Sequence, residues 1–480
     1  MSQSFRRKWK DNDTMSSLNQ EYQKYICRSR KSLELYHRAL QVMAGGVSHN
    51  LRYFAPYPCY LARAEGARFW DVDGNEYLDF WMGHYLNILG HTPEPILSAL
   101  EKQLRQGIQW GIVHELQIEL AEIVQRLIPS AEKVRFCCSG TEAVIYARRL
   151  ARAATSRQKF IKMEGSWHGA GTHSATIDNP DLSQGKRGGS CEDAIQNTIL
   201  VRFNDVQQAI DRIREHADDL AAVIMEPILG EGGFIPAERK FLEAIREETN
   251  RAGALLIFDE IITGFRVGLS GAQGLYNIRP DLTTLGKILG GGMPIGAVVG
   301  RADIMELCSP TANLPEYKKT LIGGGTFSCA PLCMRAGIAM LRYLEENAQK
   351  IYPYLEAAGN QIRTGIEQAF ARYGIAAKCT GIGSLFMTHF PKIKLEELKD
   401  SHTLAVDCDL EKREKELKIR LLNKGVFVMH GGGAISMAHT PADLAIALEK
   451  VEEVAKEMAE DQVGRRQAAS CCLEEAVLKS

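Results

Sequence analysis

The chain has 480 residues, of which 45% are hydrophobic and 24% are charged, an ordinary balance for a globular protein with two or three structural units. Its 58 basic and 59 acidic side chains nearly cancel, so charge gives no reason to expect nucleic acid or an anionic membrane as a partner. No apolar stretch approaches the roughly 18 residues of a membrane-spanning helix, and the polar N-terminus lacks a signal-peptide pattern. The twelve cysteines show no metal-ligand spacing, so we expect reduced thiols in a cytoplasmic protein.

The first elements follow an expected N-terminal extension at residues 1–30. Helical spacing begins in RKSLELYHRALQVM. The segment ARFWDVDGNEYLDF predicts two short strands, because Asp73-Gly74-Asn75 between them favours a turn with positive φ. Two amphipathic helices are then predicted, in PILSALEKQLRQG and HELQIELAEIVQRLI.

The middle of the chain alternates short apolar runs with helical segments. The expected strands are KVRFCC, KFIKME, LAAVIMEP, ALLIFDEI and PIGAVVG, and the expected helices are TEAVIYARRLARAAT and RKFLEAIREETNRAG. This alternation indicates an α/β fold whose parallel sheet is covered by helices on both faces. From about Ala336 the pattern returns to long helices with a few short strands such as GVFVMH, and the last helix, PADLAIALEKVEEVAKEMAE, precedes a polar tail.

Two residues at expected strand ends point to imine chemistry. Lys287 lies among apolar residues and glycines in DLTTLGKILGGGMPIG, and removal from water would lower its pKa and leave a nucleophilic amine. Asp259 ends the apolar run ALLIFDE, at the sheet edge where α/β proteins bind ligands. A buried carboxylate requires a cation, and a protonated pyridine nitrogen is one that also makes its ring an electron sink. Taken singly, Lys287 could also be an ordinary surface amine, and Asp259 could also be a helix cap.

A phosphate site is available where a strand runs into a helix. Ser139, Gly140 and Thr141, in RFCCSGTEAV, offer backbone N–H groups and hydroxyls to an anion, although a plain helix cap explains the same letters. A second glycine-rich turn, GGGTF, carries Thr326. Trp167, in GSWHG, is placed either to stack on a flat ring or to fill the core.

Five motifs in order resemble the class III pyridoxal-phosphate aminotransferases of fold type I: SGTEA, WHG, EPILGEGG, LLIFDEIITGFR and DLTTLGKILGGGMPIGA. The likeness spans about residues 35–460. Within that family the chain is most similar to glutamate-1-semialdehyde 2,1-aminomutase, through GGVSHNLRYF, DVDGNEYLDF, TGFRVGLSGAQG and SMAHT. The resemblance implies a large domain with a mostly parallel seven-stranded sheet between helices, and a smaller α+β domain built from both chain ends. The implied division is 1–30 extension, 31–90 first part of the small domain, 91–335 large domain, 336–464 rest of the small domain and 465–480 tail.

The resemblance also implies roles for the cofactor residues. Lys287 would form the internal aldimine with pyridoxal 5'-phosphate and move the proton during transfer, and Asp259 would pair with the pyridine nitrogen. The phosphate would be held by Ser139, Gly140 and Thr141, joined by Thr326 of the neighbouring subunit in a homodimer with shared active sites. Trp167 would stack on the ring, His168 would support its loop, and Glu226 of EPILGEGG belongs to the same cofactor site.

On the substrate side, Arg52 aligns with the arginine that grips the substrate carboxylate in the aminomutase, and its planar fork suits a carboxylate or a phosphonate. Glu231 matches a glutamate that masks a second arginine in many class III transaminases. No arginine occurs between Arg420 and Arg465, which argues against a 2-oxoglutarate mode that depends on that switch.

Two histidines mark departures from the aminomutase. His84 replaces a tryptophan, and His430 lies beside the place of an acid. Both are expected either to add hydrogen-bonding or positive character to the pocket or to serve as structural histidines. The leading hypothesis is an aminotransferase for a small acidic or ω-amino compound. The alternatives are an aminomutase, and an ammonia-lyase or phospho-lyase acting on an amino alcohol phosphate or a hydroxy-aminophosphonate.

Overall fold

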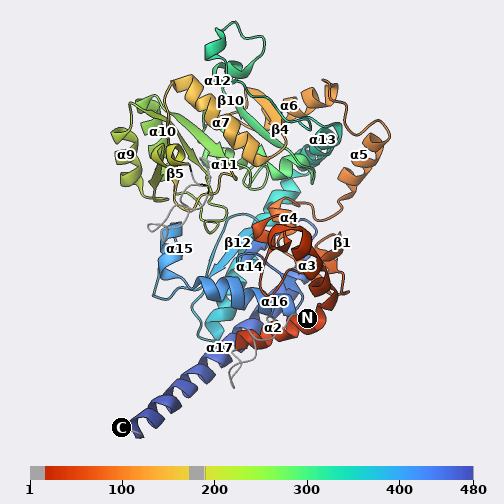
Figure 1. The fold of residues 1–480 in the computed structure, drawn as a ribbon, viewed down its shortest axis with the longest axis vertical. Coiled ribbons are helices and arrows are strands. Elements are labelled where there is room, and N and C mark those ends of the chain that lie inside the picture. The colour runs from red at the N-terminus through yellow and green to blue at the C-terminus, as the bar shows by residue number, and fades with distance from the viewer. Residues whose placement is uncertain (1–16, 172–188, 190, 479–480) are drawn as a thin grey trace.

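The computed structural model describes residues 17–171, 189 and 191–478. Figure 1 shows two lobes, with the middle of the chain above and both chain ends below. Among the described residues, no helix is long and apolar enough to cross a membrane.

The upper lobe is organised by a seven-stranded sheet. Its spatial order is β4 (Lys133–Cys137), β10 (Gly296–Gly300), β9 (Leu282–Gly286), β8 (Leu255–Asp259), β7 (Leu220–Met225), β5 (Lys159–Met163) and β6 (Thr198–Val201). Only β10 runs antiparallel to its neighbours, and the remaining pairs are parallel. The predicted mostly parallel seven-stranded sheet is thus confirmed.

Helices cover both faces of this sheet, as the alternating pattern predicts. Along β8, Leu256 and Phe258 join the core under α9 and α10, whereas Leu255 and Ile257 join the core under α7, because successive side chains of a strand face opposite ways. The upper-lobe helices are α5 (Glu94–Leu104), α6 (Glu115–Leu127), α7 (Gly140–Thr155), α8 (Glu192–Gln196), α9 (Val206–Glu215), α10 (Arg239–Ala252), α11 (Gly271–Tyr276), α12 (Ala302–Met305) and α13 (Pro331–Glu346), with short 3-10 turns at η4 (Lys287–Gly290), η5 (Glu306–Cys308) and η6 (Glu316–Lys318).

The lower lobe combines two small sheets from the chain ends. One sheet has the order β1 (Leu61–Glu65), β2 (Arg68–Asp71), β3 (Glu76–Asp79) and β13 (Val426–Phe427), and the other has β11 (Lys378–Thr380), β12 (Leu385–His389) and β14 (Gly432–Ala434). Its helical segments are α3 (Arg30–Val42), η1 (Ala44–Gly46), η2 (Asn50–Arg52), α4 (Met82–Tyr85), α14 (Ala348–Arg372), α15 (Ser401–Asp407), a π-helical turn η7 (Lys412–Leu417) and α16 (Lys418–Asn423). Because β13 pairs with β3, the two chain ends share one sheet.

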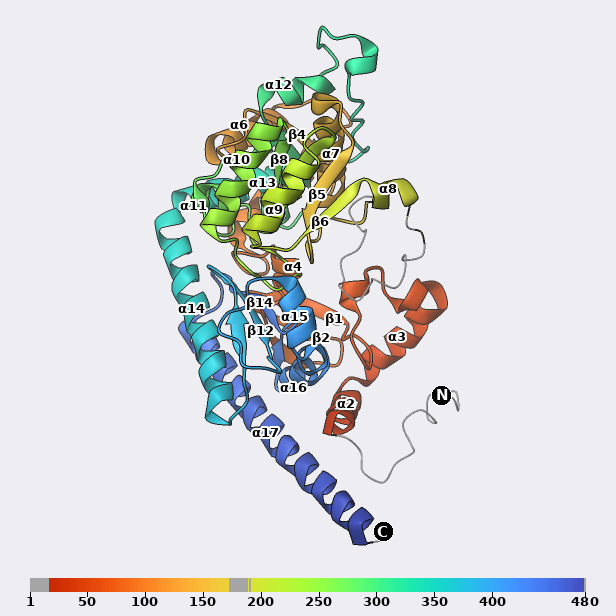
Figure 2. The same ribbon diagram turned by 90° about the vertical axis from the view of Figure 1, so that its left-hand side faces the viewer.

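Both chain ends differ from the predicted boundaries. Helix α2 (Ser17–Arg28) buries Tyr22 and Tyr25 against Ile419 and Leu422, so the packed part of the small lobe begins before residue 31. At the other end, α17 (Pro441–Leu478) continues through most of the segment expected to be a tail, and Figure 2 shows it extending away from the lobe. Residues 1–16 and 479–480 lie outside the described residues.

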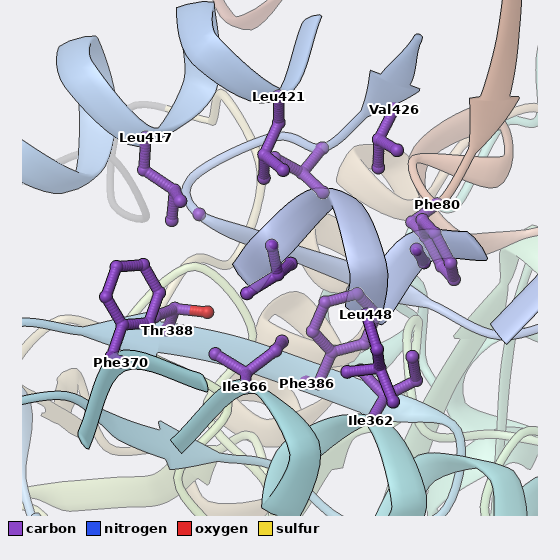
Figure 3. A pocket seen from close by; sticks show the side chains of 14 residues that line it. Phe80, Ile362, Ile366, Phe370, Phe386, Thr388, Leu417, Leu421, Val426 and Leu448 are labelled. Atoms are coloured by element: carbon purple, nitrogen blue, oxygen red, sulfur yellow. The ribbon is translucent and has the colours of Figure 1, made fainter. Parts of the chain in front are cut away.

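The small lobe has a closely packed apolar centre. Figure 3 shows the side chains that converge there, with the rings of Phe370 and Phe386 beside aliphatic groups such as Ile366 and Leu421. They leave a void of only about 20 Å³, and Thr388 is the one polar side chain lining it. A water molecule needs two to four polar partners, so this void is a packing gap and not a ligand site.

Candidate active site

Five of the singled-out side chains gather at one edge of the seven-stranded sheet. Asp259 is the last residue of β8, Lys287 directly follows β9, and Glu226 directly follows β7. Trp167 and His168 lie in the loop after β5. Because these four strands are parallel, their carboxyl ends meet at the same edge, which is where α/β sheets bind ligands.

Lys287 is held in a tight backbone position. Its φ is 45°, in the left-handed region that residues other than glycine seldom adopt. A Cβ at nearby Gly290 would lie 2.7 Å from Ile295 Cγ2, so a larger residue would force the loop apart. Burial lowers the pKa of Lys287, while the charges of Asp259 and Glu226 act in the opposite direction. The site thus favours a neutral amine beside two carboxyl groups.

The Asp259 carboxyl group is buried and accepts three hydrogen bonds. His168 donates its Nδ1 hydrogen to Oδ2 over 2.8 Å, and Oδ1 accepts from Ile261 N and Thr284 Oγ1, both at 3.1 Å. Burial lowers the pKa of His168, although the carboxylate opposes this, so the ring is a neutral donor. Its Nε2 is buried and has no hydrogen-bond partner among the described residues. His168 therefore does more than support a loop, because it fixes the carboxylate.

Glu226 connects the loops that follow β5 and β7. Its Oε1 accepts from Trp167 N at 2.9 Å, and its Oε2 accepts from Gly230 N at 3.0 Å. Burial raises the pKa of Glu226 to about 8, and the charge of Asp259 adds to this effect. Trp167 is anchored by its backbone while its side chain stays 38% exposed, which leaves the indole ring accessible to a planar ligand.

The start of α7 lies beside this group. Ser139 caps the helix, with Oγ accepting from Glu142 N at 3.2 Å, so the helix-cap interpretation holds. Thr141 Oγ1 accepts from Ala170 N at 3.3 Å, and a Cβ at Gly169 would lie 2.5 Å from that oxygen. The loop after β5 therefore closes directly over the first turn of α7, whose N–H groups attract anions.

Thr326 lies on a turn of the upper lobe. It is exposed and lines a hollow of about 910 Å³ together with Ile112, Val113 and Ile118, all of which are more than half exposed. The Thr326 carbonyl accepts a hydrogen bond from the Gln109 side chain.

Across from the sheet edge, the small lobe contributes a separate cavity of about 430 Å³. Arg52, Ser48, Trp81 and His84 line it, and Arg52 is exposed at the end of η2. Burial and nearby positive charges lower the pKa of His84 to about 3. The charged groups responsible are His49, Arg52, Lys287 and His430. Of these lining residues, His84 is therefore close enough to Lys287 for the two groups to interact electrostatically.

His430 belongs to a chain of polar contacts that sequence reasoning missed. Its Nδ1 hydrogen is donated to Glu414 Oε2 over 3.1 Å, and Arg413 forms an ion pair with Glu414 at 2.8 Å. Glu414 stands in EKREKEL, which reads as a solvated charge run and carries no local signal of a site. Glu231, in the loop after Glu226, is half-buried, and its charge reaches Lys287.

Known proteins match this chain over nearly its whole length. Residues 52–460 match the family described as Aminotransferase class-III. A glutamate-1-semialdehyde 2,1-aminomutase of Thermodesulfovibrio yellowstonii is 36% identical over 445 residues, which cover 90% of this chain and 100% of the relative. A solved omega-transaminase from Sphaerobacter thermophilus is 32% identical with a TM-score of 0.82, covering 89% of this chain and 98% of its own. A solved transaminase with PLP bound is also 32% identical, with a TM-score of 0.80 and coverage of 90% and 99%.

The matched stretch runs through both lobes and contains the whole sheet edge described above. The chain belongs to the class III aminotransferase family of enzymes.

Proposed function

We propose that the chain binds pyridoxal 5'-phosphate at the sheet edge and transfers an amino group from a small acidic or ω-amino compound. When bound, this cofactor supplies an aldehyde that condenses with amines and a ring that withdraws electrons. The observation that carries the proposal is the Lys287 amine, with its lowered pKa, beside an Asp259 carboxylate held at 2.8 Å by His168. A 32% identical transaminase solved with PLP bound supports the choice of cofactor.

The residues at this edge fit the parts of that cofactor. Asp259 is a buried carboxylate with three fixed donors around it, and a pyridinium N–H would supply the cation that such a group requires. Ser139, Gly140 and Thr141 at the start of α7 would hold the phosphate. Trp167 would stack on the ring. Glu226 would keep the indole in place by accepting a hydrogen bond from the backbone N–H of Trp167.

Lys287 is assigned two tasks in this scheme. Its amine would hold the cofactor, and it would take the proton from the carbon that bears the substrate amino group. A neutral amine is needed for both tasks, and burial favours that form. The Arg52 guanidinium would bind an acidic group of the substrate at the far side of the cavity. The sequence has no arginine between Arg420 and Arg465, so the acceptor is not expected to use an arginine switch in that part of the chain.

A homodimer is part of the proposal. The exposed apolar face around the 910 Å³ hollow would be covered by a second copy, which removes apolar surface from water. The large exposed apolar side chains on and beside this face are Trp110, Ile112, Val113, Ile118, Leu321 and Phe327. In that arrangement Thr326 would reach the phosphate site of the partner.

An aminomutase is the second candidate, because the 36% identical relative carries that activity in its name and matches over its full length. A lyase is the third, because imidazoles line the substrate cavity. One assay separates the three: the yellow protein is incubated with candidate amines without a keto acid. Conversion of the bound cofactor to its amino form indicates amino transfer, an isomerised substrate indicates a mutase, and released ammonia or phosphate indicates a lyase. If no amine changes the cofactor or is itself changed, the proposed function is wrong.

A further inference from the structure

A left-handed turn lies where the small lobe faces the sheet edge. Four consecutive residues have positive φ, with 45° at Met82, 61° at Gly83, 62° at His84 and 69° at Tyr85. Asp79 holds the turn by accepting from Met82 N at 3.2 Å. Side chains other than glycine rarely adopt this conformation, and such strain concentrates at binding and catalytic sites.

The turn fixes the position of the His84 imidazole. The Nε2 atoms of His84 and His430 are both buried and have no hydrogen-bond partner among the described residues. The Trp81 ring lies near both, with its centroid 4.3 Å from that of His84 and 6.3 Å from that of His430. His430 also has a positive φ, of 53°. His84 lines the 430 Å³ cavity, and His430 lines an adjoining cavity of about 270 Å³ that shares Phe54 and Met429 with it. Buried polar atoms are nearly always paired in native proteins, so these two unpaired nitrogens indicate a ligand that satisfies them.

Glu414 fixes the orientation of the second imidazole. Burial opposes ionisation of Glu414, but the hydrogen bond from His430 and the charge of Arg413 lower its pKa to about 2. A carboxylate therefore accepts the Nδ1 hydrogen of His430 at 3.1 Å, and only Nε2 is left to meet a ligand.

Arg52 and Asp79 are the charged side chains that line the cavity. Arg52 forms no ion pair with any residue that the structure describes. Asp79 also lines the cavity, but its carboxylate is already occupied by His91 Nε2 at 2.9 Å and by backbone N–H groups. An anionic ligand is thus favoured.

The imidazoles restrict which anion fits best. A phosphate monoester has three terminal oxygens and its second ionisation near a pH of about 6. A phosphonate has the same three oxygens and is a weaker second acid, so near neutral pH both groups offer acceptors and an O–H donor. Either group can pair with a ring nitrogen whether or not that nitrogen carries the hydrogen. A carboxylate or a sulfonate at the same pH offers acceptors only.

We propose that His84 and His430, the latter held by Glu414, form with Arg52 the subsite for the non-reacting end of the substrate, and that this end is a phosphonate or a phosphate monoester. The inference rests on the proposed function, because it names the substrate class of the same site. Glu414 is a positioning residue that acts through His430.

Calorimetric titration of the holoenzyme tests this subsite with four small probes: ethylphosphonate, ethyl phosphate, ethanesulfonate and propanoate. Cofactor absorbance is recorded throughout, so that the phosphate cradle is known to be filled. We expect ethylphosphonate or ethyl phosphate to bind at least tenfold more tightly than the other two probes, and the tighter of the pair identifies the substrate class. Equal affinity for ethanesulfonate or propanoate would overturn the inference.

Variants locate the binding to these side chains. His84→Phe and His430→Phe should each raise the dissociation constant of the tighter probe about tenfold, the effect of losing one hydrogen bond to a charged group. Glu414→Gln should weaken binding in the wild-type background and have no further effect in the His430→Phe background, which a purely structural role would not produce. His216→Phe, at the end of α9, is the matched control. Unchanged binding in both histidine variants would refute the subsite.

A second pair of variants and two distinguishable negative results complete the test. If the phenylalanine variants fail to fold, His84→Gln and His430→Gln retain a polar side chain and should still weaken the phosphonate relative to ethanesulfonate. If the protein forms no holoenzyme at all, the proposed function fails. If the holoenzyme forms but does not discriminate among the probes, only the subsite fails.

Discussion

Replacing His168 by phenylalanine tests how the sheet-edge carboxylate is held. Phenylalanine keeps a ring in the buried position but removes the Nδ1 hydrogen that is donated to Asp259 over 2.8 Å. Hydrogen bonds to charged groups contribute about 1.5–3 kcal/mol, which is roughly ten- to hundredfold in an equilibrium constant. We expect the dissociation constant of pyridoxal 5'-phosphate to rise by that factor, because Asp259 loses the donor that orients its carboxylate.

The assay is an absorbance titration of the apoprotein with pyridoxal 5'-phosphate. A His168→Phe change in an Asp259→Asn background should have little additional effect, because residues that act through one another are not additive. Wild-type affinity in the single variant, or full additivity in the double variant, would refute the role assigned to His168.

Three further predictions concern stability and assembly. Burial lowers the pKa of His389 to about 3, below the unfolded value of about 6.5. The unfolded chain therefore binds more protons, and stability falls as pH drops from about 6.5 towards 3. His389→Gln should reduce the loss in urea midpoint between pH 7 and 5, and an unchanged loss would contradict this. Leu421→Ala, in the small-lobe core, should lower the free energy of unfolding in urea by about 2–5 kcal/mol. The exposed control Ile446→Ala should change it by no more than about 0.5 kcal/mol, and similar losses in both variants would be evidence against this packing. Ile112→Asp should shift the protein from dimer to monomer in light scattering, whereas Ile393→Asp, exposed elsewhere, should not; a dimer that survives the first change argues against the proposed interface.

The sequence was most informative where chemistry coincides with a strand end. Asp259 and Lys287 close apolar runs, and parallel strands bring such ends together, so their proximity was predictable from periodicity alone. The sheet was predictable for the same reason, since buried parallel strands are apolar on both faces. The number of strands was predicted from the resemblance to a known family and not from periodicity.

Other features had no local signal. Glu414 contacts His430 only because the chain folds back over a separation of 16 positions, and its charged neighbours resemble a solvated helix face. The left-handed turn at 82–85 contains a single glycine, so its conformation is imposed by the tertiary fold. Helix α2 reads as polar, but two tyrosines bury it against α16, a long-range contact that periodicity cannot reveal.

The central claim is that Lys287 carries the cofactor covalently. Borohydride reduction of the native protein supplied with pyridoxal 5'-phosphate, followed by peptide mass spectrometry, reads this bond directly. The expected result is one reduced cofactor adduct on the peptide that contains Lys287, absent in Lys287→Ala. An unmodified Lys287 peptide, or an adduct that persists in the alanine variant on another lysine, would contradict the account.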